Sequence, residues 1–243
     1  MQYRTIWISD VHLGTRGSSA DKLLDFLRDN ESEKLYLVGD IIDGWRLKKK
    51  FYWAQSHSDF IQKILRKARK GTEVIYIPGN HDEAAREYVG ASFEKISIHQ
   101  NFVHVTADGK RLMVMHGDEF DMVINHHKWM AYVGDFLYEN LIRLNRLNSW
   151  YRNWRGLPHW SLSAYAKHNV KRAVNFIGNF EQTISEYART HGYDGVVCGH
   201  IHHAEIKEID GFIYANDGDW VESCTALVEH FDGRLEIIRY LEQ

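Results

Sequence analysis

The chain of 243 residues is long for one domain and short for two, which favours one compact α/β domain carrying an elaboration. Hydrophobic residues make up 44% and charged residues 26%, and with two prolines and no low-complexity tract this composition argues against a disordered or collagen-like chain. No apolar run approaches the roughly 18 residues of a membrane span. The start of the chain shows no signal-peptide cleavage pattern, and two cysteines cannot form a disulfide framework, so we expect a cytoplasmic protein.

The net charge of −3 is an average over two parts of opposite sign. Residues 140–180 contain seven Lys or Arg and no Asp or Glu, whereas the remainder of the chain has 23 basic and 33 acidic residues. Four of the eight tryptophans lie in or beside this window: Trp129, Trp150, Trp154 and Trp160. The chain therefore combines an acidic body with a basic, aromatic zone.

The first half of the chain alternates between strand and helix patterns. The predicted elements are a strand at 4–9, a helix at 18–29, a strand at 34–38, a helix at 52–70 and a strand at 73–77. Ser18 or Ser19 is a candidate cap for the first helix, and Gly71 ends the second. The second helix has one apolar stripe, formed by Phe60, Ile61, Ile64, Leu65 and Ala68. The alternation predicts right-handed crossovers and a parallel sheet.

Three Asp-Gly pairs, each between two short apolar runs, predict β-hairpins in the second half. The paired runs are 102–106 with 111–115, 206–209 with 212–215, and 227–230 with 235–240. A further buried strand is predicted at 194–198, and helical patterns cover 121–146 and 163–190. The hairpins are expected to add antiparallel strands to the sheet system.

Aspartate, histidine and asparagine follow five of the predicted strands directly. The five motifs are Asp10-Val11-His12, Gly39-Asp40-Ile41-Ile42-Asp43, Gly79-Asn80-His81-Asp82, Met115-His116-Gly117-Asp118 and Gly199-His200-Ile201-His202. In open α/β sheets the carboxyl ends of strands converge on the ligand crevice, so these side chains should meet in one region.

Such a collection of ligands is what a two-metal site requires. Two divalent ions about 3.5–4 Å apart can clamp the attacking and leaving oxygens of a phosphoryl displacement. The absence of cysteine from all five motifs disfavours a tetrahedral structural zinc site. Mixed carboxylate, imidazole and amide ligands suit Mn²⁺, Fe or a catalytic Zn²⁺.

The order Asp-x-His, Gly-Asp-x-x-Asp, Gly-Asn-His-Asp, His, Gly-His-x-His resembles that of the calcineurin-like metallophosphoesterases. The resemblance implies an α/β sandwich of two mixed β-sheets flanked by helices. It further implies a single domain over 1–243, with a helical cap insertion at about 121–190.

The resemblance also implies a role for each motif. One metal would be held by Asp10, His12 and His202, the other by Asn80, His116 and His200, with Asp40 as the bridge. A hydroxide between the metals would attack phosphorus in line. His81 would donate a proton to the leaving oxygen or stabilise its charge, and Asp43 would fix the tautomer of His81.

Several polar residues near the motifs have simpler interpretations. Asp82 and Asp118 either support the ligands or only form turns. His203 is expected to point away from the metals, and Cys198 to be a small core residue. The histidines expected at the surface or in ordinary packing are His57, His99, His104, His191 and His230.

The basic, aromatic zone is where we expect the substrate to bind. The candidate substrate contacts are Arg143, Arg146, Trp150, Arg152, Trp154, Arg155, Lys167 and Lys171. As a cap over the active site, this zone would place arginines on phosphate and aromatic rings on acyl chains or at a membrane surface. The alternative is a helical hairpin whose tryptophans pack into the core while its arginines are solvated.

A closer resemblance is to the UDP-2,3-diacylglucosamine diphosphatase branch of the same family. It is carried by Ile8-Ser9-Asp10-Val11-His12-Leu13, by Met115-His116-Gly117-Asp118, by the helical insertion before Gly199-His200-Ile201-His202, and by Gly218-Asp219-Trp220. This branch implies Mn²⁺, a place in lipid A synthesis, and cleavage of UDP-diacylglucosamine to UMP and the acylated sugar 1-phosphate. The partners expected are a phosphorylated, lipid-like substrate and the inner membrane surface, with no obligate protein partner.

Two positions depart from that branch. It commonly has Arg at the position of His81 and Glu-Ala-Trp where this chain has Asp43-Gly44-Trp45. His81 and Asp43 resemble the general phosphodiesterase pattern instead, which leaves a phosphodiesterase or nuclease as the alternative. Against a nuclease, the acidic remainder of the chain disfavours an extended nucleic-acid track, although tryptophans could stack on single-stranded bases.

Overall fold

The structure is a computed structural model that describes residues 1–121 and 162–242, with side chains outside 162–175. The chain divides into two compact units, one formed by 1–119 with 181–243 and the other by 120–180. Both β-sheets belong to the first unit. The single-domain organisation with an insertion at 121–190 stays a prediction.

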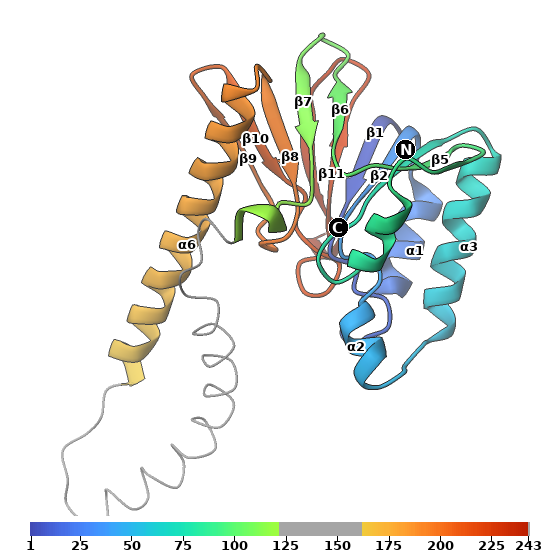
Figure 1. The fold of residues 1–243 in the computed structure, drawn as a ribbon, viewed down its shortest axis with the longest axis horizontal. Helices are drawn as coiled ribbons and strands as arrows, with labels where there is room; N and C mark the ends of the chain where they lie inside the picture. The colour runs from blue at the N-terminus through green and yellow to red at the C-terminus, as the bar shows by residue number, and fades with distance from the viewer. Residues whose placement is uncertain (122–161, 243) are drawn as a thin grey trace, which may run out of the picture. The chain divides into compact units, whose positions relative to one another are not determined.

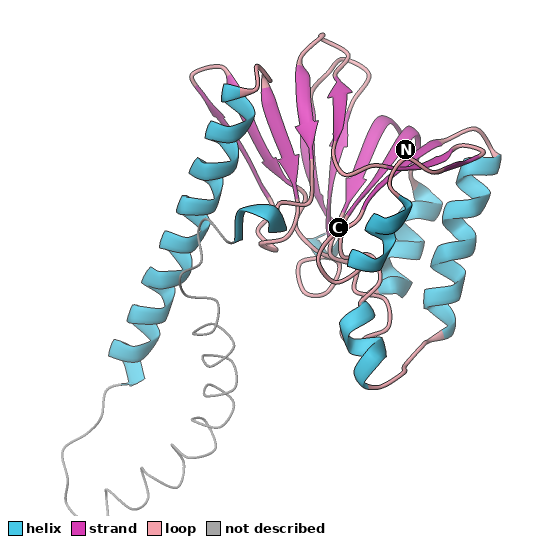
Figure 2. Cartoon of the chain, in the orientation of Figure 1, coloured by secondary structure: helices cyan, strands magenta, loops and turns pink. Residues whose placement is uncertain are grey.

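The first unit contains two mixed β-sheets (Figures 1 and 2). One has seven strands in the order β12-β11-β1-β2-β3-β5-β4, and the other has five in the order β6-β7-β8-β10-β9. The strands are β1 (Gln2–Ile8), β2 (Glu31–Val38), β3 (Glu73–Ile77), β4 (Ser92–Phe93), β5 (Ile96–Ile98), β6 (Phe102–Val105), β7 (Arg111–Val114), β8 (Gly195–Cys198), β9 (Glu205–Ile209), β10 (Phe212–Asn216), β11 (Thr225–Glu229) and β12 (Leu235–Arg239). The predicted sandwich of two mixed sheets is confirmed.

The helices connect and cover these strands. They are α1 (Ala20–Asp29), α2 (Gly44–Lys49), α3 (Gln55–Arg69) and α6 (Leu162–Thr190), with short 3₁₀ helices η1 (Glu83–Tyr88), η2 (Asp118–Phe120) and η3 (Tyr240–Glu242). The predicted parallel arrangement is confirmed, because β1, β2, β3 and β5 pair in parallel. The three predicted hairpins are confirmed as the antiparallel pairs β6–β7, β9–β10 and β11–β12.

Two details of the predicted helices differ in the structure. Ser19 is the N-cap residue of α1, as predicted, but it makes no side-chain capping bond, and its hydroxyl donates instead to the carbonyl of Val221 at 3.4 Å. On α3, Leu65 of the predicted stripe is 46% exposed, whereas Lys67 is buried. The Lys67 ammonium donates to the carbonyl of Asn30 at 2.8 Å and to Glu31 at 2.7 Å. The spacing of apolar residues could not reveal that Lys67 is buried, because its partner Glu31 lies 36 residues away in the chain.

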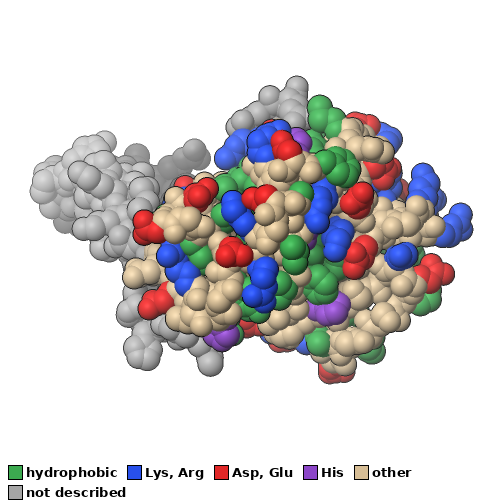
Figure 3. All heavy atoms as spheres, turned by 90° about the horizontal axis from the view of Figure 1, so that it is seen from above, with side chains coloured by type: hydrophobic (Ala, Val, Ile, Leu, Met, Phe, Trp, Pro, Cys, Tyr) green, Lys and Arg blue, Asp and Glu red, His purple; other side chains and the backbone are tan. Residues whose placement is uncertain are grey.

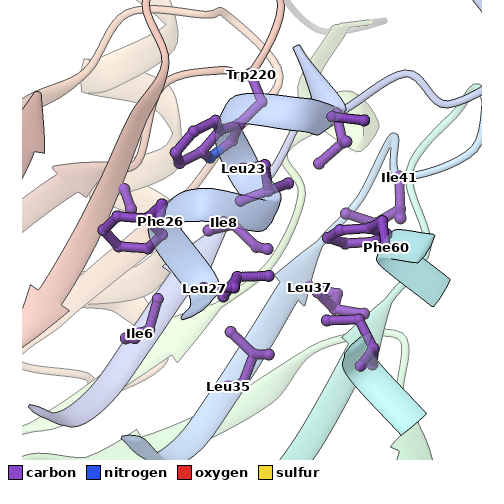
Figure 4. Close-up of a cluster of buried hydrophobic side chains, with 14 of the residues drawn as sticks. Ile6, Ile8, Leu23, Phe26, Leu27, Leu35, Leu37, Ile41, Phe60 and Trp220 are labelled. Carbon is purple, nitrogen blue, oxygen red and sulfur yellow. The ribbon is translucent and has the colours of Figure 1, made fainter. Parts of the chain in front are cut away.

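Alternation along the central strands separates two hydrophobic clusters. Ile6 and Ile8 of β1 point to the side covered by α1 and α3, where the cluster in Figure 4 forms. Trp7, between them, points to the opposite face and packs with residues of the second sheet such as Val114 and Val197. The central strands of the seven-stranded sheet are therefore buried on both faces near their carboxyl ends, which holds those ends rigidly.

The last turns of α6 lie against the second sheet. Arg189 donates to the carbonyl of Ile209 at 2.6 Å and stacks over the ring of Phe212 at 4.6 Å. Glu181 pairs with Lys207 of β9 at 2.7 Å. Within the described part of the chain, no helix combines the length and apolarity needed to cross a membrane.

Candidate metal centre

Five loops that follow strands bring their polar side chains together. The loops follow β1, β2, β3, β7 and β8, and they carry Asp10 and His12, Asp40, Asn80 and His81, His116, and His200 and His202. Five of these residues have a positive φ between 50° and 69°: Asp10, His12, Asp40, His200 and His202. The left-handed region is unfavourable for residues with a Cβ by roughly 1–2 kcal/mol. Such strain concentrates at functional sites, where the surrounding structure enforces it.

Asp10, His12 and His202 form one group of candidate ligands, with one ligand atom from each within 4.8 Å of the others. Oδ1 of Asp10 lies 3.0 Å from Nε2 of His202 and 3.7 Å from Nε2 of His12. Asp10 and His12 are buried, whereas the His202 side chain is 40% exposed. This group therefore opens to solvent on the His202 side.

Asp40, His116 and His200 form a second group with the same spacing. Nε2 of His116 lies 3.4 Å from Oδ2 of Asp40, and the rings of His116 and His200 are 5.1 Å apart. Asn80 is next in the chain to His81, whose backbone N–H donates to Oδ1 of Asp40 at 2.8 Å. Asn80 therefore enters the region of this second group.

Asp40 lies where a bridging ligand would be needed. Its Oδ2 is 3.4 Å from Nε2 of His116 and 3.8 Å from Nε2 of His12, so one oxygen faces both groups. The close packing of the loop after β3 on Asp40 requires glycine at position 79, because a Cβ there would clash with the Asp40 carboxylate. Gly39, which has a φ of 79°, likewise leaves room for the ring of His116.

Two imidazoles are oriented through their second nitrogen. Nδ1–H of His116 donates to the carbonyl of Val38 at 2.8 Å, and Nδ1 of His12 lies 3.3 Å from Oδ2 of Asp43. Both contacts leave Nε2 as the nitrogen that carries a lone pair toward the site. The ring orientations needed for metal ligation are therefore fixed by the protein itself.

The donor atoms fit divalent cations. Among the described residues, Asp10 Oδ1, His12 Nε2, Asn80 Oδ1 and His116 Nε2 are buried without a hydrogen-bond partner. Buried polar atoms are normally hydrogen-bonded, and each that is not costs about 1–3 kcal/mol. Carboxylate, imidazole and amide donors that converge in this way suit Mn²⁺, Fe or Zn²⁺.

The charges of the site favour a cation as well. Burial raises the pKa of Asp10, but the neighbouring imidazoles of His12 and His202 outweigh it and hold that pKa well below its usual value. Burial lowers the pKa of His12, but Asp10 and Asp43 outweigh it and raise the pKa to about 10. The carboxylates thus attract positive charge, which protons supply in the metal-free protein and metal ions can replace.

His81 lies at the edge of this centre. Its Nε2 is 4.0 Å from Oδ2 of Asp40, and its Nδ1 is 3.1 Å from Oδ1 of Asp43, within ion-pair distance but not aligned as a hydrogen bond. The ring of Trp45 packs on His81 with centroids 4.3 Å apart. From the sequence, Trp45 was named only as part of Asp43-Gly44-Trp45 and was not predicted as a residue of the site.

Asp43 does more than contact His81. Its Oδ2 faces His12, and its Oδ1 accepts from the backbone N–H of Arg46 at 2.8 Å, which caps α2. Burial raises the pKa of Asp43, but its contacts with His12 and His81 outweigh it and lower that pKa well below its usual value. One carboxylate therefore joins a candidate ligand, a candidate proton donor and a helix start.

Asp82 and Asp118 stabilise the loops. Asp82 accepts hydrogen bonds from the backbone of Gly79 at 2.6 Å and of Ile41 at 2.8 Å, and from the hydroxyl of Tyr76 at 2.6 Å. It therefore ties the loop after β2 to the loop after β3. Asp118 pairs with Arg86 at 2.7 Å.

The remaining singled-out residues lie elsewhere. His57, His104 and Cys198 are buried packing residues, and His203 is exposed beside Glu205 at 3.5 Å. The candidate substrate contacts Arg143, Arg146, Trp150, Arg152, Trp154 and Arg155 lie outside the described residues. Lys167 and Lys171 belong to α6, and their side chains lie outside the described part. These assignments stay predictions.

Known proteins resemble the chain in both sequence and fold. A UDP-2,3-diacylglucosamine hydrolase of Azotobacter vinelandii is 23% identical over 215 residues, which cover 84% of each chain. The DNA polymerase II small subunit of Methanothermobacter thermautotrophicus is 26% identical over 152 residues, 50% of this chain and 32% of that protein. The chain spans less than half the length of the first curated relatives that it matches. A hypothetical protein of Pyrococcus horikoshii has the same fold, with a TM-score of 0.51, 10% identity, and coverage of 98% of this chain and 88% of that one.

The family comparison covers most of the chain and ends just before β9. The model for "Calcineurin-like phosphoesterase" matches residues 3–204, a range that contains every one of the proposed ligands. Together with the two mixed sheets and the converging ligand groups, this match shows that the chain belongs to the calcineurin-like phosphoesterase family of hydrolases.

Proposed function

We propose that the protein is a dimetal phosphohydrolase that cleaves the pyrophosphate of a UDP-2,3-diacylglucosamine-type substrate to UMP and an acylated sugar 1-phosphate. The observation that carries the dimetal part is the placement of Asp40 Oδ2 between two ligand groups, 3.4 Å from His116 and 3.8 Å from His12. Two divalent cations at these groups would neutralise phosphoryl oxygens and supply Lewis-acid chemistry. Mn²⁺ is the proposed metal, because the resemblance to the UDP-2,3-diacylglucosamine branch implies it and the mixed carboxylate, imidazole and amide donors fit it as they fit Fe and Zn²⁺.

In this proposal the chain's own residues perform three tasks. Asp10, His12 and His202 would hold one cation, and Asn80, His116 and His200 would hold the other, with the Asp40 carboxylate available to both. His81 donates a proton to the leaving oxygen, and the Asp43 carboxylate beside its Nδ1 stabilises the charged imidazole. Trp45 packs on the ring of His81 and limits its rotation.

The substrate class is supported by the relatives' names and by the basic, aromatic zone. The Azotobacter relative, aligned over 84% of both chains, is a UDP-2,3-diacylglucosamine hydrolase. Arginines and tryptophans within 140–180 would bind the phosphates and acyl chains, and would bring the enzyme to the inner membrane surface.

A general phosphodiesterase is the second candidate. It is favoured by the His81–Asp43 contact at 3.1 Å, which takes the place of the arginine and glutamate of the lipid A branch. Nucleic acid is the less favoured phosphodiester. On the face of the described residues seen in Figure 3, Lys and Arg are interspersed with Asp and Glu instead of forming a long basic track.

A turnover panel with Mn²⁺ tests the proposal. It offers UDP-2,3-diacylglucosamine, the same nucleotide sugar without acyl chains, bis-p-nitrophenyl phosphate, cyclic dinucleotides and single-stranded DNA. We expect the acylated nucleotide to be cleaved fastest and to release UMP. If only bis-p-nitrophenyl phosphate and a nucleotide diester are cleaved, the phosphodiesterase alternative replaces the lipid substrate. If none is cleaved while Mn²⁺ binds, the hydrolase proposal itself fails.

A further inference from the structure

A buried serine beside the metal centre is surrounded by three oxygen atoms. Oγ of Ser9, the residue before Asp10, lies 2.6 Å from Oδ2 of Asp10, 2.7 Å from Oδ1 of Asp217 and 3.0 Å from the carbonyl of Gly218. All three distances are those of hydrogen bonds. Ser9 and Asp10 directly follow β1, whereas Asp217 follows β10 of the other sheet, so the contact joins the two sheets at the site.

Counting protons constrains how this cluster is held together. A serine hydroxyl has one proton to donate and can accept with its lone pairs. If both carboxylates were ionised, Ser9 could satisfy only one of them and would face the other oxygen-to-oxygen. The two carboxyl contacts are both satisfied when Asp217 carries a proton and donates to Ser9, while Ser9 donates to Asp10, and the longer contact with the Gly218 carbonyl then has no proton of its own.

The surroundings of the two carboxyl groups support this direction. Oδ2 of Asp10 also accepts from the backbone N–H of His200 at 2.9 Å, which stabilises the ionised form of Asp10. Asp217 is fully buried, and its Oδ2 has no hydrogen-bond partner within the described part of the chain. A buried carboxylate with an unpartnered oxygen is strongly disfavoured in the ionised form. Burial, the largest cause, and the neighbouring Asp10 raise the pKa of Asp217.

We infer that Asp217 and Ser9 form a hydrogen-bonded chain that positions the Asp10 carboxylate, with Oδ2 anchored by the protein and Oδ1 directed at the metal. Oδ1 is the oxygen that lies 3.0 Å from His202 and 3.7 Å from His12. The inference rests on the proposed role of Asp10 as a metal ligand. Ser9 and Asp217 are positioning residues, because they act through Asp10.

The test measures Mn²⁺ affinity directly, from the electron paramagnetic resonance signal of the free ion during titration of the full chain. Loss of a residue that orients a metal ligand weakens binding by about 10–100-fold. We expect Ser9→Ala and Asp217→Ala to weaken Mn²⁺ binding about tenfold or more. Asp217→Asn should bind within about twofold of wild type, since its amide can donate to Ser9 as the protonated carboxyl does.

Thr5→Val is the matched control. Thr5 lies on β1, and its buried hydroxyl donates to Glu229 at 2.8 Å, away from the ligand groups. This variant removes one buried hydroxyl–carboxylate bond from the same strand, so it should lower the free energy of unfolding without changing Mn²⁺ affinity. Urea unfolding of every variant in EDTA shows whether a loss of affinity merely follows a loss of stability.

Three outcomes would overturn the inference. They are wild-type Mn²⁺ affinity in Ser9→Ala, an Asp217→Asn variant as weak as Asp217→Ala, or a Thr5→Val variant that loses the same affinity. Asp10→Ala separates this failure from failure of the proposed centre. If Asp10→Ala loses Mn²⁺ while Ser9→Ala does not, only the positioning role is wrong. If Asp10→Ala keeps full Mn²⁺ stoichiometry and affinity, the proposed ligand role of Asp10 fails first.

Discussion

The two ends of β1 each carry a buried cluster of charged residues, and the clusters differ in how their polar atoms are satisfied. At the amino end, the buried Glu229 of the neighbouring β11 accepts from Arg4 at 2.7 Å, from Thr5 at 2.8 Å and from the backbone of Ala107 at 2.7 Å. His104 lies 2.9 Å away, with its other ring nitrogen 3.1 Å from the hydroxyl of Tyr36. Every Glu229 oxygen therefore has partners within the protein.

At the carboxyl end of β1, several buried polar atoms of the candidate ligands have no such partners in the described part of the chain. Asp10 Oδ1, His12 Nε2 and His116 Nε2 lack hydrogen-bond partners among the residues described, and Asp10 and His12 have a positive φ of 50°. Arg4, Thr5 and Glu229 have ordinary negative φ. This difference distinguishes two kinds of buried charge cluster. A satisfied cluster with a relaxed backbone stabilises the fold, while an unsatisfied one with a strained backbone is prepared for a ligand.

The largest expected effect separates the two clusters by activity. Asp40→Ala removes the oxygen that faces both ligand groups, so Mn²⁺-dependent hydrolysis of bis-p-nitrophenyl phosphate should fall by at least about 10³-fold. Initial rates at saturating Mn²⁺ measure the loss. Glu229→Gln, assayed below its melting temperature, is the control and should keep most of its turnover. Unchanged turnover in Asp40→Ala would contradict the dimetal assignment.

Loss of the Glu229 carboxylate should lower stability and leave the metal centre intact, whereas Asp40→Ala should abolish activity. Glu229→Gln leaves Arg4 and several donors without their charged acceptor, so the free energy of unfolding should fall by about 3 kcal/mol. Urea unfolding in EDTA measures this loss, while a Mn²⁺ titration of the folded variant should give wild-type affinity. A weakened Mn²⁺ affinity with no loss of stability would mean that the Glu229 cluster serves the metal centre instead.

A third expected effect distinguishes the proposed proton donor, His81, from the proposed metal ligands. His81→Ala should lower turnover by about 10²-fold, the size of a general-acid contribution, while leaving two Mn²⁺ per chain. Elemental analysis of the metal content and initial rates measure the two properties separately. His230→Ala, which removes a histidine outside the site, is the control. Loss of one metal ion in His81→Ala would make this residue a ligand.

The smallest expected effect concerns pH. Burial raises the pKa of Glu229, but bonds from His104 and Ala107 outweigh it and lower the pKa from 4.5 to about 2. The stabilisation by this carboxylate is therefore complete above pH 4.5 and is lost as the pH falls toward 2. The difference in unfolding free energy between wild type and Glu229→Gln should shrink by about 2 kcal/mol on going from pH 7 to pH 3. Urea unfolding in EDTA measures it, and a difference independent of pH would contradict the charged role of Glu229.

Much of the fold could be predicted because its signals are local. The Asp-Gly pairs specify their hairpins, and alternating strand and helix patterns specify the parallel pairing of β1, β2 and β3. Leu65 on α3 was predicted wrongly as part of the buried stripe, and the burial of Lys67 was not predicted, because its ammonium depends on Glu31, which is distant in sequence. Ser19 was predicted as a cap from its residue type, but its hydroxyl points to Val221.

The sequence predicted which residues come together in the candidate metal centre, because side chains that directly follow parallel strands are carried to the same end of a sheet. Only the tertiary structure decided how those side chains are aimed. Asp43 lies between His12 and His81, and Ser9 lies between Asp10 and Asp217, which is 208 residues away in the chain. No sequence spacing encodes these contacts. The Asp43 contacts arise between loops that follow neighbouring strands of one sheet, and the Ser9–Asp217 contact arises where the two sheets meet.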